Sequence, residues 1–173
     1  MKRAMLCGAW AFAAVIGGAG AQAQTPIPPS AKDFAMTASQ SDQYEIMAAN
    51  VAVVQSKDAR VRTFAQDMIR DHTKLNSDLR QAAMASGLPP LEPGMSSDQA
   101  HLLSTLQGLR GAEFDRTYAH QQELAHTQAA AVEGSFAAAG SDAKLRMAAQ
   151  SALPVIQDHL KMAKQLRADL GGS

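Results

Sequence analysis

The chain has 173 residues, of which 46% are hydrophobic and only 5% aromatic, and its 16 basic residues balance 16 acidic ones. This length suits a single domain, and alanine-rich composition with Leu, Met, Gln, Lys and Arg favours helices. A formal net charge of zero provides no basic surplus to attract nucleic acid, which argues against nucleic acid as a partner.

The first 23 residues have the pattern of a secretory signal peptide. Lys2 and Arg3 precede an apolar run over 4–16, and Ala21-Gln22-Ala23 has the small-x-small form that signal peptidase cuts. The run is too short and too interrupted by glycine for a membrane-spanning helix. The sequence therefore predicts an exported protein whose mature part lacks cysteine, and so lacks disulfides and thiolate metal sites.

A proline-rich linker is predicted over 24–32, followed by an all-α domain over 33–170. Four long helices are expected, at about 33–56, 58–86, 112–139 and 142–170, with Asp33, Asp58 and Ser141 placed to cap three of them. The segment between the second and third helices contains a short helix over 97–109. This segment is long enough to cross a bundle from one end to the other.

Apolar residues recur at helical spacing in each long helix, which predicts the faces that become buried. In the first helix this stripe consists of Tyr44, Met47, Val51 and Val54. In the second and fourth helices the stripe has a histidine in its middle, His72 and His159. Pro154 lies within the fourth helix and is expected to kink it.

The segment Ile69–Arg80 returns near the C-terminus as Ile156–Arg167, with six of twelve positions identical. We interpret the second and fourth helices as copies of one ancestral helix, which turn His72 and His159 toward a shared interior. The alternative is chance similarity between two amphipathic, alanine-rich helices.

A histidine in a buried stripe must either form hydrogen bonds or bind a ligand through its ring nitrogens. Inward side chains on facing helices of a bundle are where metal sites are built, so His72 and His159 are candidate ligands for iron, copper, zinc or manganese. The alternative is that each imidazole is a core group held by a neighbouring carboxylate or carbonyl. Asp71, which precedes one of them, is expected on the flank of its helix, in a salt bridge with Lys74 or a neighbouring helix.

Two further carboxylates and one histidine complete the candidate set. Glu123 and His126 form a Glu-x-x-His pair, the half-site of di-iron carboxylate bundles. This pair lies at the border of the third helix's apolar face, beside Gln122 and Glu133, and we expect it on the solvated surface. Glu45 lies among small residues of the first helix, which leaves room for an inward carboxylate.

Three runs of the sequence resemble a family of exported bacterial proteins that carry the domain of unknown function 4142. These runs are Phe64–Lys74, Gly111–Tyr118 and Leu153–Ala163, with His126 between the last two. The resemblance covers about 34–166. It implies a ferritin-like four-helix bundle made of two helical hairpins, with a long crossover between the second and third helices, and it implies no established activity. The family's histidines fall here on His72, His126 and His159.

The wider ferritin-like superfamily would imply a di-iron site with a Glu-x-x-His pair on each of two helices. Here Ile69 and Ile156 stand three residues before His72 and His159, so only His126 has its glutamate. This incomplete set argues against iron oxidation.

Two functions follow from these observations. The first is a non-enzymatic module of the periplasm or outer membrane, associated with the envelope or with stress, that contacts an envelope protein or the membrane surface. The second is a metal-binding bundle that uses a set drawn from His72, His159, His126, Glu123 and Glu45. The residue patterns of hydrolases and nucleotide-binding enzymes do not occur. Assembly into a larger ferritin-like shell is a third hypothesis, and the sequence predicts no oligomeric state.

Overall fold

The computed structural model describes residues 29–171, and in this range it contains five α-helices and no β-strand. The helices are α1 (Ala31–Gln55), α2 (Ala59–Ala85), α3 (Ser97–Gly108), α4 (Gly111–Ala139) and α5 (Ala143–Gly171). The predicted signal peptide and most of the predicted linker lie outside the described residues. Within 29–171 no helix is both long and apolar enough to cross a membrane.

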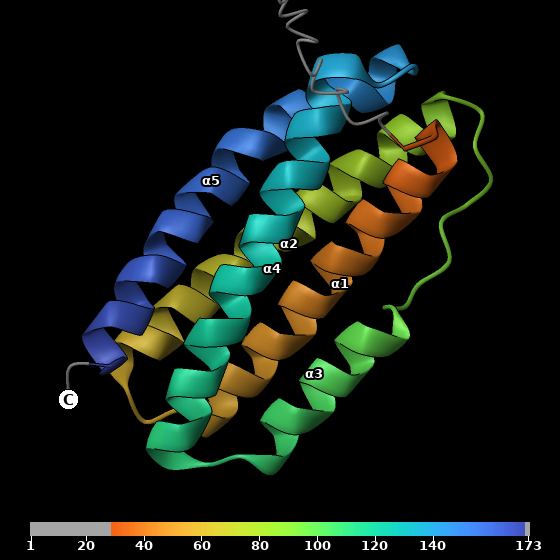
Figure 1. Ribbon diagram of the computed structural model, residues 1–173. Coiled ribbons are helices and arrows are strands. Elements are labelled where there is room, and N and C mark those ends of the chain that lie inside the picture. The colour runs from red at the N-terminus through yellow and green to blue at the C-terminus, as the bar shows by residue number, and fades with distance from the viewer. Residues whose placement is uncertain (1–28, 172–173) are drawn as a thin grey trace, which may run out of the picture.

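The four long helices form a bundle of two hairpins (Figure 1). Helix α1 packs against α2 and α4 against α5, while α2 contacts α5 and α1 contacts α4 across the hairpins. The loop after α2 leads to α3, which lies alongside α1 and also contacts α4 (Figure 1). This arrangement confirms the predicted ferritin-like four-helix bundle with a crossover that contains a short helix.

The N-terminal ends of α1 and α5 are capped by short polar side chains. Ser30 caps α1 by accepting a hydrogen bond from the backbone N–H of Asp33, so the helix begins before the predicted cap, and Asp33 instead lies in the first turn. In α5 the predicted cap Ser141 is wrong by one residue. Asp142 accepts from the backbone N–H groups of Lys144 and Leu145, because its carboxylate reaches both donors of the first turn.

The buried face of α1 differs from the predicted stripe. Val54 is 84% exposed and Met47 is 39% exposed, whereas the buried residues are mostly small: Phe34, Ala35, Ala38, Ser39, Asp42, Tyr44, Glu45, Ala48, Ala49 and Ala52. Small side chains let the neighbouring helices approach α1 closely. Phe34 and Tyr44 are the large side chains of α1 that are buried, whereas Met36, Met47 and Val54 are exposed.

The interior has two apolar clusters at opposite ends of the bundle. One contains Tyr44, Met68, Phe114, Tyr118 and Leu166, and the other contains Phe34, Leu79, Phe136, Leu145 and Ala149. In all four long helices, the residues between these clusters include buried polar ones. The bundle therefore has a polar layer in its middle, with an apolar cluster on each side.

Candidate metal centre

The polar layer brings together side chains from all four long helices. Helix α1 contributes Asp42 and Glu45, α2 contributes His72 and Asn76, α4 contributes Gln122, His126 and Glu133, and α5 contributes His159. On α1 and α4 these polar residues lie three or four positions from buried or partly buried small or apolar residues, and so on the same face of the helix. The sequence thus places polar groups on faces that packing buries.

Three histidines meet in the centre of this layer. The ring centroid of His72 lies 5.4 Å from that of His126 and 5.2 Å from that of His159, and the other two rings are 5.4 Å apart. One ring nitrogen from each lies within 4.8 Å of the others, and the Nε2 atoms of His72 and His126 are 3.3 Å apart. All three residues are buried. The predicted approach of His72 to His159 is therefore observed, with His126 as a third member.

In two of the rings, one nitrogen bonds a group outside the cluster. His126 donates from Nδ1 to the backbone oxygen of Gln122 at 2.9 Å, and a carbonyl can only accept. The Nε2 of His159 lies 3.1 Å from the carboxylate of Asp71. These bonds leave lone pairs on His126 Nε2 and on His159 Nδ1, and the latter atom is buried without a hydrogen-bond partner.

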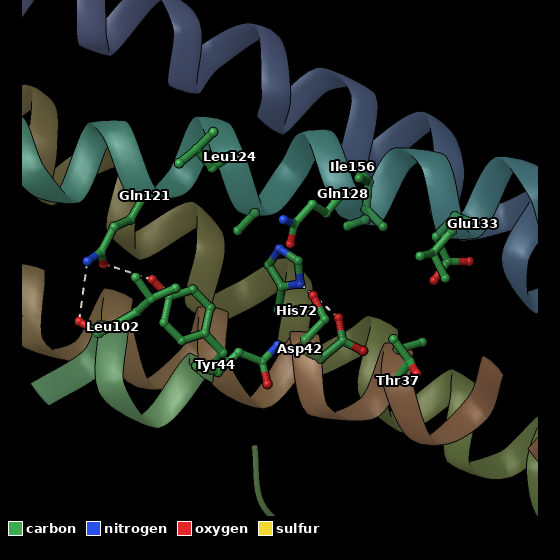
Figure 2. Close-up of a pocket in the computed structure, with 16 residues that line it drawn as sticks. Thr37, Asp42, Tyr44, His72, Leu102, Gln121, Leu124, Gln128, Glu133 and Ile156 are labelled. Carbon is green, nitrogen blue, oxygen red and sulfur yellow. Dashed lines mark hydrogen bonds and ion pairs between the residues drawn. The ribbon is translucent and has the colours of Figure 1, made fainter. Parts of the chain in front are cut away.

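The third ring, His72, has its Nδ1 at 2.8 Å from the carboxyl of Asp42 (Figure 2). If Asp42 is protonated, it donates to Nδ1, and the Nε2–H of His72 then donates to His126. If Asp42 is ionised, His72 donates from Nδ1 instead and its Nε2 keeps a lone pair. The second arrangement gives three lone pairs in one place, which is the arrangement that a metal ion requires.

Burial keeps the imidazoles neutral. It lowers the pKa of His72, and it lowers the pKa of His126 to about 3, where the nearby His72 adds repulsion. Burial also lowers the pKa of His159, again with repulsion from His72, although Asp71 opposes this change. Because neutral imidazole is the form that binds metal, His126 and His159 are ready to act as ligands, and His72 joins them when Asp42 is ionised.

Three buried carboxyl groups surround the histidines. Burial raises the pKa of Glu45 to about 7 and that of Glu133 to about 8, and it raises the pKa of Asp42 well above its usual value. Glu45 accepts a hydrogen bond from Gln122, and its other oxygen lies 3.9 Å from His126 Nδ1. Among the buried residues of 29–171 there is no Lys or Arg. This interior therefore favours an added positive charge.

The structure separates the predicted Glu-x-x-His pair. The prediction of a surface position was wrong for His126, which is 1% exposed and lies in the cluster. Glu123 is on the flank of α4 and accepts a hydrogen bond from Arg167 on α5 at 2.7 Å, so it is not part of the cluster. Glu45 is inside, close to His126. Asp71 has the expected bond to a neighbouring helix, and that bond goes to His159.

Sequence reasoning missed Asp42 and placed Gln122 and Glu133 on the surface. A signal for them exists. Asp42 continues the small-residue row of α1, four residues after Ala38, and Glu133 lies seven residues after His126, two turns along the same face of α4. On α4 the large buried residues give the signal, since Gln122 follows Tyr118 by four positions and Glu133 precedes Phe136 by three.

The comparisons with known proteins agree with this fold. The family described as "Domain of unknown function (DUF4142)" matches residues 17–166. No curated protein matches the chain. Among solved structures, "CopM in the Cu(II)-bound form" is 16% identical with a TM-score of 0.70, covering 82% of this chain and 98% of that one. A Streptomyces coelicolor protein described as a secreted DUF305 protein is 18% identical with a TM-score of 0.68, covering 82% and 93%.

Proposed function

Since this chain belongs to the DUF4142 family, whose description names no function, we propose a function from the site itself. The protein binds one transition-metal ion in the middle of its bundle, through His72, His126 and His159. The ion is held in the cell envelope and is not used for turnover. This proposal joins the two hypotheses drawn from the sequence, a non-enzymatic envelope protein and a metal-binding bundle.

The observation that carries this proposal is the hydrogen bonding of the three rings. In each ring one nitrogen is bonded outside the cluster, by Asp42, by the backbone of Gln122 or by Asp71. Metal-binding histidines are oriented in this way, with the second nitrogen donating to a carboxylate or a carbonyl. In a tetrahedral or trigonal site, metal–nitrogen bonds of about 2.0–2.1 Å keep two ligand nitrogens about 3.3–3.6 Å apart. The His72–His126 pair, at 3.3 Å, already has this spacing, and a ring nitrogen of His159 lies within 4.8 Å of the other two.

The donor set favours copper(II), with zinc(II) as the closest competitor. Imidazole suits copper, zinc, iron and nickel, and the affinity of a given site for divalent ions is highest at copper. Iron and manganese sites of bundles use carboxylate ligands, and here the carboxyl groups lie around the histidines rather than among them. A solved protein of the same fold, CopM, is described in a Cu(II)-bound form, which supports the choice of metal.

The proposed location rests on the N-terminal residues. The pattern of 1–23 is that of a cleaved signal peptide, so the mature protein is placed in the periplasm, free or at the outer membrane.

Three protein ligands leave a fourth position open on the ion. A carrier or a sequestering protein needs such a position for exchange with its partner.

Metal content and spectroscopy test the proposal. The mature chain is purified without chelator, loaded with copper(II) or zinc(II), dialysed and analysed for metal. We expect one ion per chain, and an electron paramagnetic resonance spectrum of the copper(II) form with coupling to three nitrogens. His126→Gln, and the double variant His72→Gln with His159→Gln, should lose this ion.

His120→Gln is a matched control, because His120 is on the same helix as His126 but exposed. It should bind as the wild type does. If the wild-type chain binds no stoichiometric metal after loading, or if His126→Gln retains the three-nitrogen spectrum, the proposal is wrong.

A further inference from the structure

Two cavities approach the polar layer from different sides and share three wall residues, Asp42, Glu133 and Ile156. The first, of about 230 Å³, is bordered by α1, α3 and α4 and reaches His72 (Figure 2). The second, of about 280 Å³, is bordered by α2, α4 and α5 and does not include a histidine. Of these two cavities, the first is therefore the one that connects a histidine of the centre with the side of the bundle. A third and more open cavity between α2 and α5 reaches His159, but Arg70 and Lys74 contribute to its lining.

The first cavity is lined by acidic residues and by no basic lysine or arginine. Its lining contains Asp42 and Glu133, together with neutral polar residues such as Ser41 and Gln128, and no Lys or Arg. The second cavity, in contrast, is lined by Lys144 as well as acidic residues. When these carboxyl groups ionise, they place charges of one sign between low-dielectric walls, and such a cavity concentrates ions of the opposite sign. The first cavity therefore suits a cation.

Packing alone does not explain why the side chain of Glu133 is buried. It is 6% exposed, and its Oε2 is buried without a hydrogen-bond partner. It faces the cavity from α4, while Asp42 faces it from α1 (Figure 2). An unpaired polar group of this kind is costly to bury, so a ligand for it is expected.

We propose that the first cavity is the path by which a metal ion reaches the three histidines, with Glu133 as a transient ligand on the way. This proposal rests on the proposed function. An ion that enters a narrow cavity must lose water, and a carboxylate oxygen replaces part of that hydration. Asp42 is next on the path, and through its bond to His72 it marks the end of the path at the centre.

Glu133 is too distant to belong to the final ligand set. Its Cα lies seven residues beyond that of His126 on the same helix, a rise of about 10 Å. Metal–oxygen bonds are about 2.0–2.2 Å long. Its loss should therefore change how fast the ion arrives and leaves, rather than how tightly it is held.

The experiment compares the kinetics of loading with the affinity at equilibrium. Copper(II) is mixed rapidly with the metal-free full chain, and loading is followed by the absorption of the copper(II)–imidazole centre. At about pH 8.5, where Glu133 is largely ionised, we expect Glu133→Gln to load about tenfold more slowly than the wild type, the low end of the effect of focused charge on association rates. Release to a chelator should slow by a similar factor, so that the Kd from chelator competition is nearly unchanged.

Three further variants make the result specific. Glu113→Gln removes a charge from an exposed position on the same helix and should load at the wild-type rate. Glu133→Asp keeps the carboxylate and should restore much of the rate. Ala129→Leu narrows the first cavity without changing its charge and should slow loading, which keeps the test usable if Glu133→Gln does not fold.

The outcomes separate this proposal from the one it rests on. If the wild-type chain binds no copper at equilibrium, the proposed function fails and the path fails with it. If copper binds to the histidines but Glu133→Gln and Ala129→Leu load at the wild-type rate, only the path is wrong. If Glu133→Gln instead weakens the equilibrium affinity as much as His126→Gln does, Glu133 is a permanent ligand and the path is again overturned.

Discussion

At the scale of single residues, Asp71 connects the surface of α2 to the buried ring of His159 on α5. Burial alone would raise the pKa of Asp71, but hydrogen bonds from Arg70 and His159 lower it below its usual value. The ionised carboxylate therefore holds the proton of His159 on Nε2, and Nδ1 remains for a metal ion. Asp71→Asn should weaken metal affinity about tenfold, the lower end of the usual effect of such partners. Chelator competition measures this change.

The control for Asp71 is Asp67, four residues earlier on the same helix. Asp67 bonds Arg70, as Asp71 does, but no bond joins it to His159. Asp67→Asn should therefore leave the metal affinity within a factor of about two. Equal losses in the two variants would mean that Asp71 acts through the general negative potential of this face and not through the ring of His159.

Glu133 gives a second prediction at this scale, on the pH dependence of stability. Burial, with a contribution from the charge of Asp42, raises its pKa to about 8 from an ordinary value of 4.5. Its stabilising contribution is therefore fully present below pH 4.5 and is lost as the pH rises toward 8. Glu133→Gln lacks this titration. We expect the stability of the wild type, relative to Glu133→Gln, to fall by a few kcal/mol between these limits.

Urea unfolding of the metal-free proteins at pH 5 and at pH 8 measures this difference. Glu92→Gln, at an exposed position in the loop before α3, should track the wild type at both values. A constant difference between wild type and Glu133→Gln at the two pH values would contradict a raised pKa for Glu133.

At the scale of helices, the sequence predicted which segments are helical better than which face of each is buried. Glycine, proline and capping residues determine where the helices end, and they are visible in the sequence. The predicted buried face of α1 was right at Tyr44 but wrong at Met47 and Val54, because the bundle buries alanines beside Tyr44 rather than a row of large residues. The predicted surface position of His126 was wrong for a related reason, because the polar residues Gln122 and Glu133 beside it indicated a solvent-exposed face. Polar residues on a helix face therefore do not show that the face is exposed to solvent.

The start of α5 provides a test at this scale. Asp142 accepts two backbone hydrogen bonds at the first turn and a third from Ser86, which joins the two hairpins. Asp142→Ala should destabilise the fold by about 1 kcal/mol, the usual cost of losing an N-cap. Ser141→Ala removes the cap that the sequence predicted, and it should change stability little. Thermal unfolding of both variants distinguishes the two residues, and the reverse order would restore Ser141 as the cap.

At the scale of the whole molecule, the bundle and its crossover followed from the sequence, but the three-histidine centre did not. The internal repeat related His72 to His159 because α2 and α5 have similar sequences. Helix α4 belongs to no such repeat, so only the packing of α4 against α1 and α5 brings His126 to the same place. Which side chains meet across a bundle depends on helix rotation and register, and a single sequence constrains both weakly.

The proposed ion would join the two hairpins. His72 belongs to the first hairpin, whereas His126 and His159 belong to the second. A ligand that binds only the folded state stabilises it in proportion to the logarithm of its concentration, by about 2.7 kcal/mol at a hundredfold excess over Kd. We expect the Tm to rise with copper(II) or zinc(II) concentration, and no such rise in His126→Gln.

Hydrogen exchange locates this stabilisation in the molecule. Amides in the middle of α2, α4 and α5 should exchange more slowly with metal, because opening of any of these helices there would break a metal bond. Helix α3 contributes no ligand, so its amides serve as the internal control and should exchange at the same rate with and without metal. If protection increases equally in α3, the ion acts on the surface of the molecule. If α2 is protected while α4 is not, His126 is not a ligand, and the ion is held by His72 and His159 alone.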